Sequence, residues 1–175
     1  MSTDRLERFL AFSAEATGYS RYDLLGTGEV QTYLDAADTA VGADIIDQLL
    51  DGFDAAQTTA AQANGAQARA SLSKVLRRDL LSDARLGPVA RNIAKMWYTG
   101  IWFVLPHWWV DAYGAGERNV TVTVSGNTYI EGLVWPTIGA NPPGAKAPGY
   151  GSWALPPRIP SAQPAVETVA PGISP

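Results

Sequence analysis

Proline is almost absent from the first hundred residues and frequent after them, and this asymmetry constrains the fold more than any other feature. Eleven of the twelve prolines follow position 100. Proline lacks a backbone donor and clashes with the preceding turn inside a helix. The first part of the chain can therefore form long helices, whereas the last part cannot, and we expect a mainly α-helical fold.

Apolar residues recur at helical spacing along the first hundred residues, which predicts a bundle of about five helices. In chain order the apolar faces are Leu6, Phe9 and Leu10; Val30, Tyr33, Leu34, Ala37 and Val41; Ile45, Ile46, Leu49, Leu50 and Phe53; Leu72, Val75, Leu76 and Leu80; and Val89, Ile93, Met96 and Trp97.

Residues that begin and end helices frame these segments. Asp4 followed by Glu7 matches a capping box, and Gly18 is a stop signal for the first helix. Pro88 suits the first turn of the fifth helix. Residues 55–70, rich in Ala, Gln and Thr, predict either a frayed helix or a loop.

The composition changes after the last of these helices. Residues 119–124 alternate Val with Thr or Asn, which predicts a short β-strand, and residues 125–127 predict a turn. Glycine and proline then punctuate the chain so densely that regular helix or central strand is disfavoured. We therefore expect a helical docking domain over residues 1–135 and an extended Pro/Gly-rich arm over residues 136–175.

Charge is segregated along the predicted helices. Residues 22–68 contain eight acidic side chains and no basic one, whereas residues 69–95 contain seven basic side chains and two acidic ones. We expect acidic helices to lie against basic ones, or both to be solvated faces. A metal site is a sharper alternative, but the spacing follows helix turns and not a calcium loop, which favours a solvated face for Asp44, Asp47, Asp51 and Asp54.

Several function classes are disfavoured by composition. The chain has no cysteine, which excludes c-type haem attachment, Cys-ligated iron–sulfur clusters and a Cys nucleophile. The net charge of −4 argues against a nucleic-acid partner. No apolar run approaches the roughly 18 residues of a spanning helix, so we expect no transmembrane segment. The first residues lack the basic stretch and apolar run of an export leader, which predicts none in this sequence.

Catalytic patterns are not found in the sequence. The one histidine, His107, lies among aromatic residues, and we expect it to be a packed, hydrogen-bonded ring and not a general base. Nucleophile-elbow, dinucleotide-binding and phosphate-binding glycine motifs are missing. Asn119-Val120-Thr121 matches a glycosylation sequon, a pattern that is common by chance. We therefore predict a chain that is not an enzyme by itself.

The stretch from Met96 to Trp109 is strongly aromatic, with six aromatic side chains among fourteen residues. Such a cluster can form a core, a docking surface or a sugar-stacking platform. We favour core combined with docking, because Trp and Tyr are enriched in interface hot spots. A carbohydrate-binding module that stacks sugars on Trp108 and Trp109 is the alternative, and a membrane anchor interrupted by Pro106 is the weakest. The candidate partner-binding residues are Trp97, Tyr98, Trp102, Trp108, Trp109, Tyr129, Trp135, Tyr150 and Trp153.

Three segments carry a family resemblance. They are Met96-Trp97-Tyr98-Thr99-Gly100, the stretch Tyr129-Ile130-Glu131-Gly132-Leu133-Val134-Trp135, and the glycine- and proline-rich residues from Pro142 to Trp153. The chain resembles the small subunit of bacterial FAD-dependent sugar and polyol dehydrogenases, the group of sorbitol and fructose dehydrogenase small subunits. It is also similar to the third subunit of gluconate 2-dehydrogenase. The resemblance extends over residues 5–155.

The resemblance implies a hetero-oligomeric complex. In such complexes the large catalytic subunit holds FAD and oxidises a sugar hydroxyl, and electrons pass to an acceptor or to a haem c subunit. The small subunit carries no cofactor and supports the folding, solubility and export of its partner. The family implies a periplasmic location. For the missing leader motif three explanations stay open: a leader that was removed, export that relies on the partner, or a complex that works in the cytoplasm.

Overall fold

The computed structural model describes residues 3–62, 66–116 and 118–145. The chain divides into two compact units, residues 1–134 and residues 135–175. Most described residues are helical, and one two-stranded sheet accompanies them. This confirms the predicted mainly helical fold with a short β segment. Most of the predicted Pro/Gly arm, residues 146–175, lies outside the described residues.

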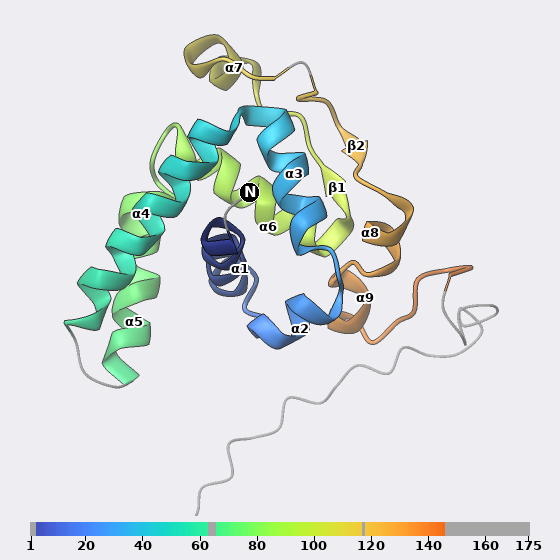
Figure 1. The fold of residues 1–175 in the computed structure, drawn as a ribbon, viewed down its shortest axis with the longest axis horizontal. Coiled ribbons are helices and arrows are strands. Elements are labelled where there is room, and N and C mark those ends of the chain that lie inside the picture. Colours follow the sequence, from blue (N-terminus) through green and yellow to red (C-terminus); the bar gives the residue numbers. More distant parts are fainter. Residues whose placement is uncertain (1–2, 63–65, 117, 146–175) are drawn as a thin grey trace, which may run out of the picture. The chain divides into compact units, whose positions relative to one another are not determined.

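The elements follow one another closely along the chain (Figure 1). In order they are α1 (Thr3–Thr17), α2 (Arg21–Gly26), α3 (Val30–Val41), α4 (Ala43–Ala61), α5 (Ala66–Val75), the π-helical turn η1 (Leu76–Leu80), α6 (Leu86–Thr99), β1 (Ile101–Trp102), α7 (His107–Tyr113), β2 (Val122–Thr123), α8 (Gly126–Ile130) and α9 (Val134–Thr137).

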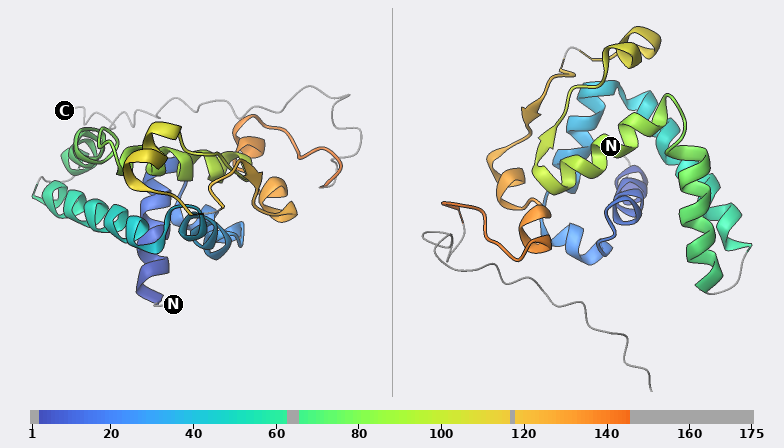
Figure 2. Two further views of the ribbon diagram at one scale, coloured as in Figure 1. Left: turned by 90° about the horizontal axis from the view of Figure 1, so that it is seen from above. Right: turned by 180° about the vertical axis from the view of Figure 1, so that it is seen from behind.

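Helices α1 and α6 form the centre of the first unit. Helix α1 contacts α2, α3, α4 and α6, and α6 also contacts η1, β1 and α8. Figures 1 and 2 show α1 crossing the direction of the surrounding helices. The predicted faces of both helices are buried, with Phe9, Ile93 and Met96 fully inaccessible. Asp4 lies in the first turn of α1, although it was predicted to cap the helix.

Helices α3 and α4 are joined by a single residue, Gly42, whose φ of 92° lies in the left-handed region. That conformation favours glycine, and it lets the second helix start at once in a new direction. The apolar faces predicted for both helices are buried in the core. Since Ala56 and Ala60 are buried as well, α4 continues to Ala61, and the first part of residues 55–70 is helix and not loop.

Helix α5 and the π-helical turn η1 run beside α4 (Figure 2). The π turn is closed by a hydrogen bond of 2.8 Å from the Leu81 amide to the Leu76 carbonyl. Leu76 and Leu80 are both buried there. The predicted fourth helix is therefore confirmed as α5 with η1. None of the helices in the described part of the chain has the length and apolar character needed to cross a membrane.

The segment after α6 differs from its prediction in three places. The strand predicted for residues 119–124 pairs only over Val122–Thr123, because Asn119 turns inward. Residues 125–127 were predicted as a turn, but Ser125 caps α8 through a capping box with Thr128. The glycine- and proline-rich arm begins with the helical turn α9, where Pro136 fits because the first turn does not use its missing donor.

Candidate functional site

Three of the predicted partner-binding tryptophans lie in the core. Trp97, Trp102 and Trp109 are each at most 1% exposed. The Trp97 ring packs on the Tyr33 ring with centroids 4.5 Å apart. The Trp109 indole N–H donates to the Arg85 carbonyl at 2.7 Å. Burial of these three side chains confirms the core part of the predicted core and docking role, and their contact with a partner stays a prediction.

Of the other predicted docking residues that the structure describes, Trp108 is the most exposed. Its exposed fraction is 53%, and that of Tyr129 is 37%. Tyr98 is half-buried, and its hydroxyl donates to the Thr17 carbonyl at 2.8 Å, while burial raises its pKa. Trp135, in the second unit, is partly buried.

Tyr150 and Trp153 lie outside the described residues. Among the predicted docking residues that the structure describes, Trp108 and Tyr129 are exposed, whereas Trp97, Trp102 and Trp109 are buried.

The burial of Trp109 weakens the sugar-stacking alternative, because that interpretation needs Trp108 and Trp109 side by side on the surface. Consecutive residues of a helix point in directions about 100° apart. At the start of α7 this turns Trp108 outward and Trp109 into the core. A single exposed indole then remains of the proposed platform.

His107 is exposed at the first position of α7. Among the described residues no hydrogen bond to its ring occurs. The prediction of a packed, hydrogen-bonded ring is therefore wrong. Pro106 precedes the helix and directs the histidine toward solvent instead of the aromatic core.

An apolar groove lies between α3 and the two-stranded sheet. Its volume is about 510 Å³, and Val120, Val122 and Val124 line the sheet side while Ala36 and Thr32 line the helix side. Val120 is 53% exposed and Val122 is 48% exposed. Exposed apolar side chains gathered on one surface are typical of interaction sites.

Val104 is a further exposed apolar residue near the groove. It is 53% exposed, and its backbone N–H donates to the Thr121 hydroxyl at 3.0 Å, which holds it beside residues 120–122. We call Val104, Val120 and Val122 the apolar strip. Sequence analysis missed it, although the Val/Thr alternation of residues 119–124 was the signal that could have found it.

Asn119 anchors the loop that leads into β2. Its side-chain oxygen accepts from the Trp102 indole N–H at 3.3 Å and from the Leu105 backbone N–H at 3.0 Å. The loop itself is fixed by Gly116, whose N–H donates to the Ala40 carbonyl at 2.9 Å. Asn119 is 9% exposed, so the sequon asparagine has a structural role and is not presented at the surface.

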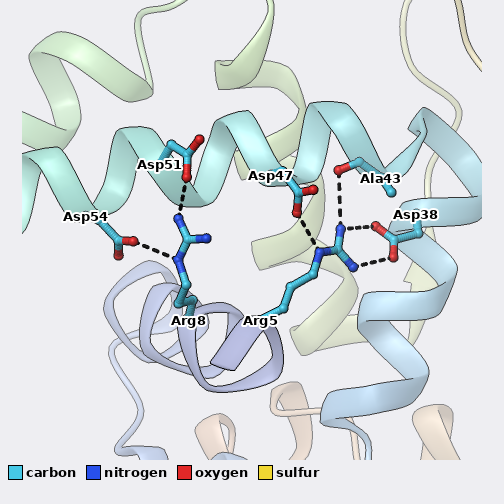
Figure 3. Close-up of polar contacts among 7 residues, drawn as sticks. All are labelled: Arg5, Arg8, Asp38, Ala43, Asp47, Asp51 and Asp54. Carbon is cyan, nitrogen blue, oxygen red and sulfur yellow. Dashed lines mark hydrogen bonds and ion pairs between the residues drawn. The ribbon is translucent and has the colours of Figure 1, made fainter. Parts of the chain in front are cut away.

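Three acidic residues of α4 and one of α3, Asp38, pair with arginines of α1 (Figure 3). Arg5 donates to Asp47 at 2.5 Å and to both oxygens of Asp38 at 2.6 and 2.7 Å. Arg8 donates to Asp51 at 2.6 Å and to Asp54 at 2.7 Å. The hydrogen bonds to Asp38 and to Asp51 raise the pKa of Arg5 and of Arg8, respectively.

The predicted charge arrangement is confirmed in part, because acidic α4 lies beside α5 and η1 and the Asp44 and Asp51 side chains are each 72% exposed. The ion pairs of α4, however, are formed mostly with α1. The acidic segment was expected to face the basic residues 69–95 or to be solvated. Only Asp44, 3.7 Å from Arg85, forms an ion pair with that segment among the described residues. In the same part of the chain no group of three His, Cys, Asp or Glu side chains could hold a metal ion. The carboxylates at Asp47, Asp51 and Asp54 join two helices instead.

We expect Arg5→Ala to lower the free energy of unfolding by about 2 kcal/mol, because a charge-assisted bidentate pair is lost in a partly buried place. The Arg5 side chain is 16% exposed and that of Asp38 is 20% exposed. Urea unfolding followed by circular dichroism at 222 nm measures the loss.

Arg8→Ala is the matched control for Arg5→Ala. Its partners Asp51 and Asp54 are 72% and 45% exposed, so the expected loss is less than about 1 kcal/mol and shrinks in 1 M salt. Arg5→Lys should recover only part of the stability, because an ammonium group cannot form the bidentate contact. Equal losses of stability for Arg5→Ala and Arg8→Ala would contradict the larger contribution that we assign to the less exposed Arg5–Asp38 pair.

Comparisons of the chain with protein-family models, with curated proteins and with solved structures found no match. The family resemblance therefore remains an interpretation of the sequence. The groove, the apolar strip and the exposed Trp108 are the structural features that support a docking role.

Proposed function

We propose that this chain is a non-catalytic small subunit that docks on the FAD-bearing catalytic subunit of a sugar or polyol dehydrogenase complex. In this role it supports the folding and stability of the large subunit and, as the resemblance implies, its export to the periplasm. The large subunit holds FAD, and a haem c subunit is a further candidate partner.

The observation that carries the docking role is the apolar strip beside the groove. Val104, Val120 and Val122 each leave about half of their surface exposed. Placing such a surface against a partner removes apolar area from water at roughly 25 cal/mol per Å². Trp108 supplies the type of aromatic side chain that is enriched in interface hot spots. The identity of the partner is supported by the sequence resemblance alone.

Co-expression with the adjacent large-subunit reading frame tests the proposal. We expect a stable yellow complex that reduces a dye in the presence of a sugar, and a colourless, poorly soluble chain when it is expressed alone. A large subunit that is intact and active without this chain would overturn the required-partner role. A fluorescence shift on titration of the isolated chain with millimolar sugars would favour the carbohydrate-binding alternative.

Within the complex, Trp108→Ala should weaken association by roughly tenfold or more, as expected for an interface anchor. The melting temperature of the variant should stay within a few degrees of the parent, because Trp108 is half exposed. Pull-down of the large subunit at graded concentrations measures the affinity. Tyr22→Ala is the control, since Tyr22 is an aromatic residue of α2 that is 84% exposed. Equal effects at both positions would remove Trp108 from the interface.

A further inference from the structure

The two outer edges of the small sheet differ in whether other described residues bond to their backbone groups. Strands β1 and β2 are antiparallel, with Ile101 opposite Thr123 and Trp102 opposite Val122. The Val124 N–H donates to the Gly100 carbonyl at 2.9 Å. In an antiparallel pair, residues that bond across the ladder alternate with residues whose backbone groups point away from it. The register therefore directs the backbone groups of Thr121 and Thr123 outward from β2.

The outer edge of β1 is closed by side chains of α6. The Asn92 amide donates to the Phe103 carbonyl at 2.6 Å, and its oxygen accepts from the Phe103 N–H at 3.2 Å. The Thr99 hydroxyl accepts from the Ile101 N–H at 3.3 Å. Asn92 is buried and takes the place that the backbone of a third strand would occupy.

The outer edge of β2 has no such cover among the described residues. None of the hydrogen bonds there uses the backbone N–H or carbonyl of Thr121 or Thr123, and both residues are exposed. Figure 1 and the right panel of Figure 2 both place β2 at the outside of the sheet. An open strand edge is a template for pairing with another chain, and folded proteins normally cover or charge it.

The surface next to this edge specifies what can pair with it. Val120 and Val122 line the groove at alternate positions, so a paired strand would bring apolar side chains against them at the same period of two. Arg118 lies at the groove and is exposed, without an ion pair among the described residues. The carboxylate of Asp35, on the opposite wall, already accepts from Gln31 at 2.7 Å. Because the guanidinium of Arg118 has no ion pair among the described residues, it can meet a carboxylate of the occupant.

We propose that an extended segment of the FAD-bearing subunit adds to the open edge of β2 as a third strand, with apolar residues at alternate positions and a carboxylate opposite Arg118. This inference rests on the proposed function. Backbone bonds to Thr121 and Thr123 would supply affinity, and the groove and Arg118 would supply specificity, as in other cases of strand addition.

Amide hydrogen exchange on the co-expressed complex tests the inference directly. The amides of Thr121 and Thr123 should exchange at least about tenfold more slowly in the complex than in the free chain, because they gain acceptors. Thr123→Pro should weaken association about tenfold, since it deletes an outward donor, and edge strands tolerate proline there. Thr123→Val keeps the donor and the β-branched shape and should bind like the parent.

Charge variants and a fold check accompany these measurements. Arg118→Glu should weaken association by roughly tenfold, whereas Arg118→Lys should keep most of the affinity. Protection of the Val124 amide, which bonds to Gly100, reports whether Thr123→Pro keeps the sheet. If that protection is lost, Thr123→Pro has disturbed the sheet. The two Arg118 variants and amide hydrogen exchange in the parent complex then test strand addition.

The outcomes separate the two proposals. A complex of unchanged affinity in which Thr121 and Thr123 still exchange fast would overturn strand addition and leave the docking role intact. Failure to form any complex would overturn both. A concentration-dependent dimer of the chain alone that protects the same two amides would show that the edge pairs with a second copy, which would also overturn the inference.

Discussion

Replacing Trp97 by alanine should lower the free energy of unfolding by about 3–5 kcal/mol, which is the range for removing a large aromatic side chain from a packed core. Trp97 is fully buried in the face of α6 that packs against α1 and α3, and its ring contacts Tyr33. The remaining cavity would lie where the central helices meet, so the structure cannot collapse into it easily. Urea unfolding measures the loss, and the melting temperature should fall by roughly 10 °C or more.

Two controls make the Trp97 experiment specific. The Trp97 indole N–H has no hydrogen-bond partner in the described part of the protein. Trp97→Phe therefore removes volume without breaking a hydrogen bond, and the expected loss is only about 1–2 kcal/mol. Trp108→Ala should cost less than about 1 kcal/mol, because that indole is half exposed. If Trp97→Ala were as mild as Trp108→Ala, the assignment of Trp97 to the core would be wrong.

The helical part of the fold was predictable because local periodicity and burial agree there. In α3 the residues predicted to share one face, from Val30 to Val41, are the residues that the core buries. In α6 the face of Val89, Ile93, Met96 and Trp97 is buried in the same way. For such helices the pattern of apolar residues alone determines which side faces the core.

The aromatic cluster was less predictable, because tertiary contacts divide it. Trp108 and Trp109 are adjacent and chemically identical in the sequence, yet α7 places one outside and one inside. The phase of that helix depends on how the chain leaves β1 and passes Pro106. It also depends on the Arg85 carbonyl, 24 residues away, which receives the Trp109 N–H.

Contacts between distant residues also explain why the main source of the counter-charges was not predicted. Arg5 and Arg8 lie between 33 and 46 residues from the aspartates that they bind. The acidic helices were expected to lie against the basic ones or to be solvated faces, because opposite charges relieve each other's repulsion. The packing of α1 against α3 and α4 brings two arginines to the carboxylates instead. The segregation of charge along the sequence shows which helices need oppositely charged partners. The packing of the helices decides which residues supply them.

Asn119→Ala should lower the free energy of unfolding by about 2–4 kcal/mol, because it leaves two buried donors without an acceptor. The Trp102 indole N–H and the Leu105 backbone N–H both donate to the Asn119 side-chain oxygen. Each unsatisfied buried donor costs about 1–3 kcal/mol. Urea unfolding again measures the loss, and near-ultraviolet circular dichroism should change because Trp102 loses its fixed environment.

Thr121→Ala is the matched control for Asn119→Ala, because it removes another side-chain acceptor of a backbone N–H beside the same sheet. Its hydroxyl accepts from the Val104 N–H, which lies at an exposed position where water can replace it. The expected loss is therefore below about 1 kcal/mol. Both substitutions destroy the sequon equally, so a difference between them reports burial and not glycosylation. Losses of similar size would mean that Asn119 is no more than a surface loop residue. A much larger loss at Asn119 would mean that the buried hydrogen bonds of Asn119 hold the segment that leads into β2, and with it Val122 and this side of the groove.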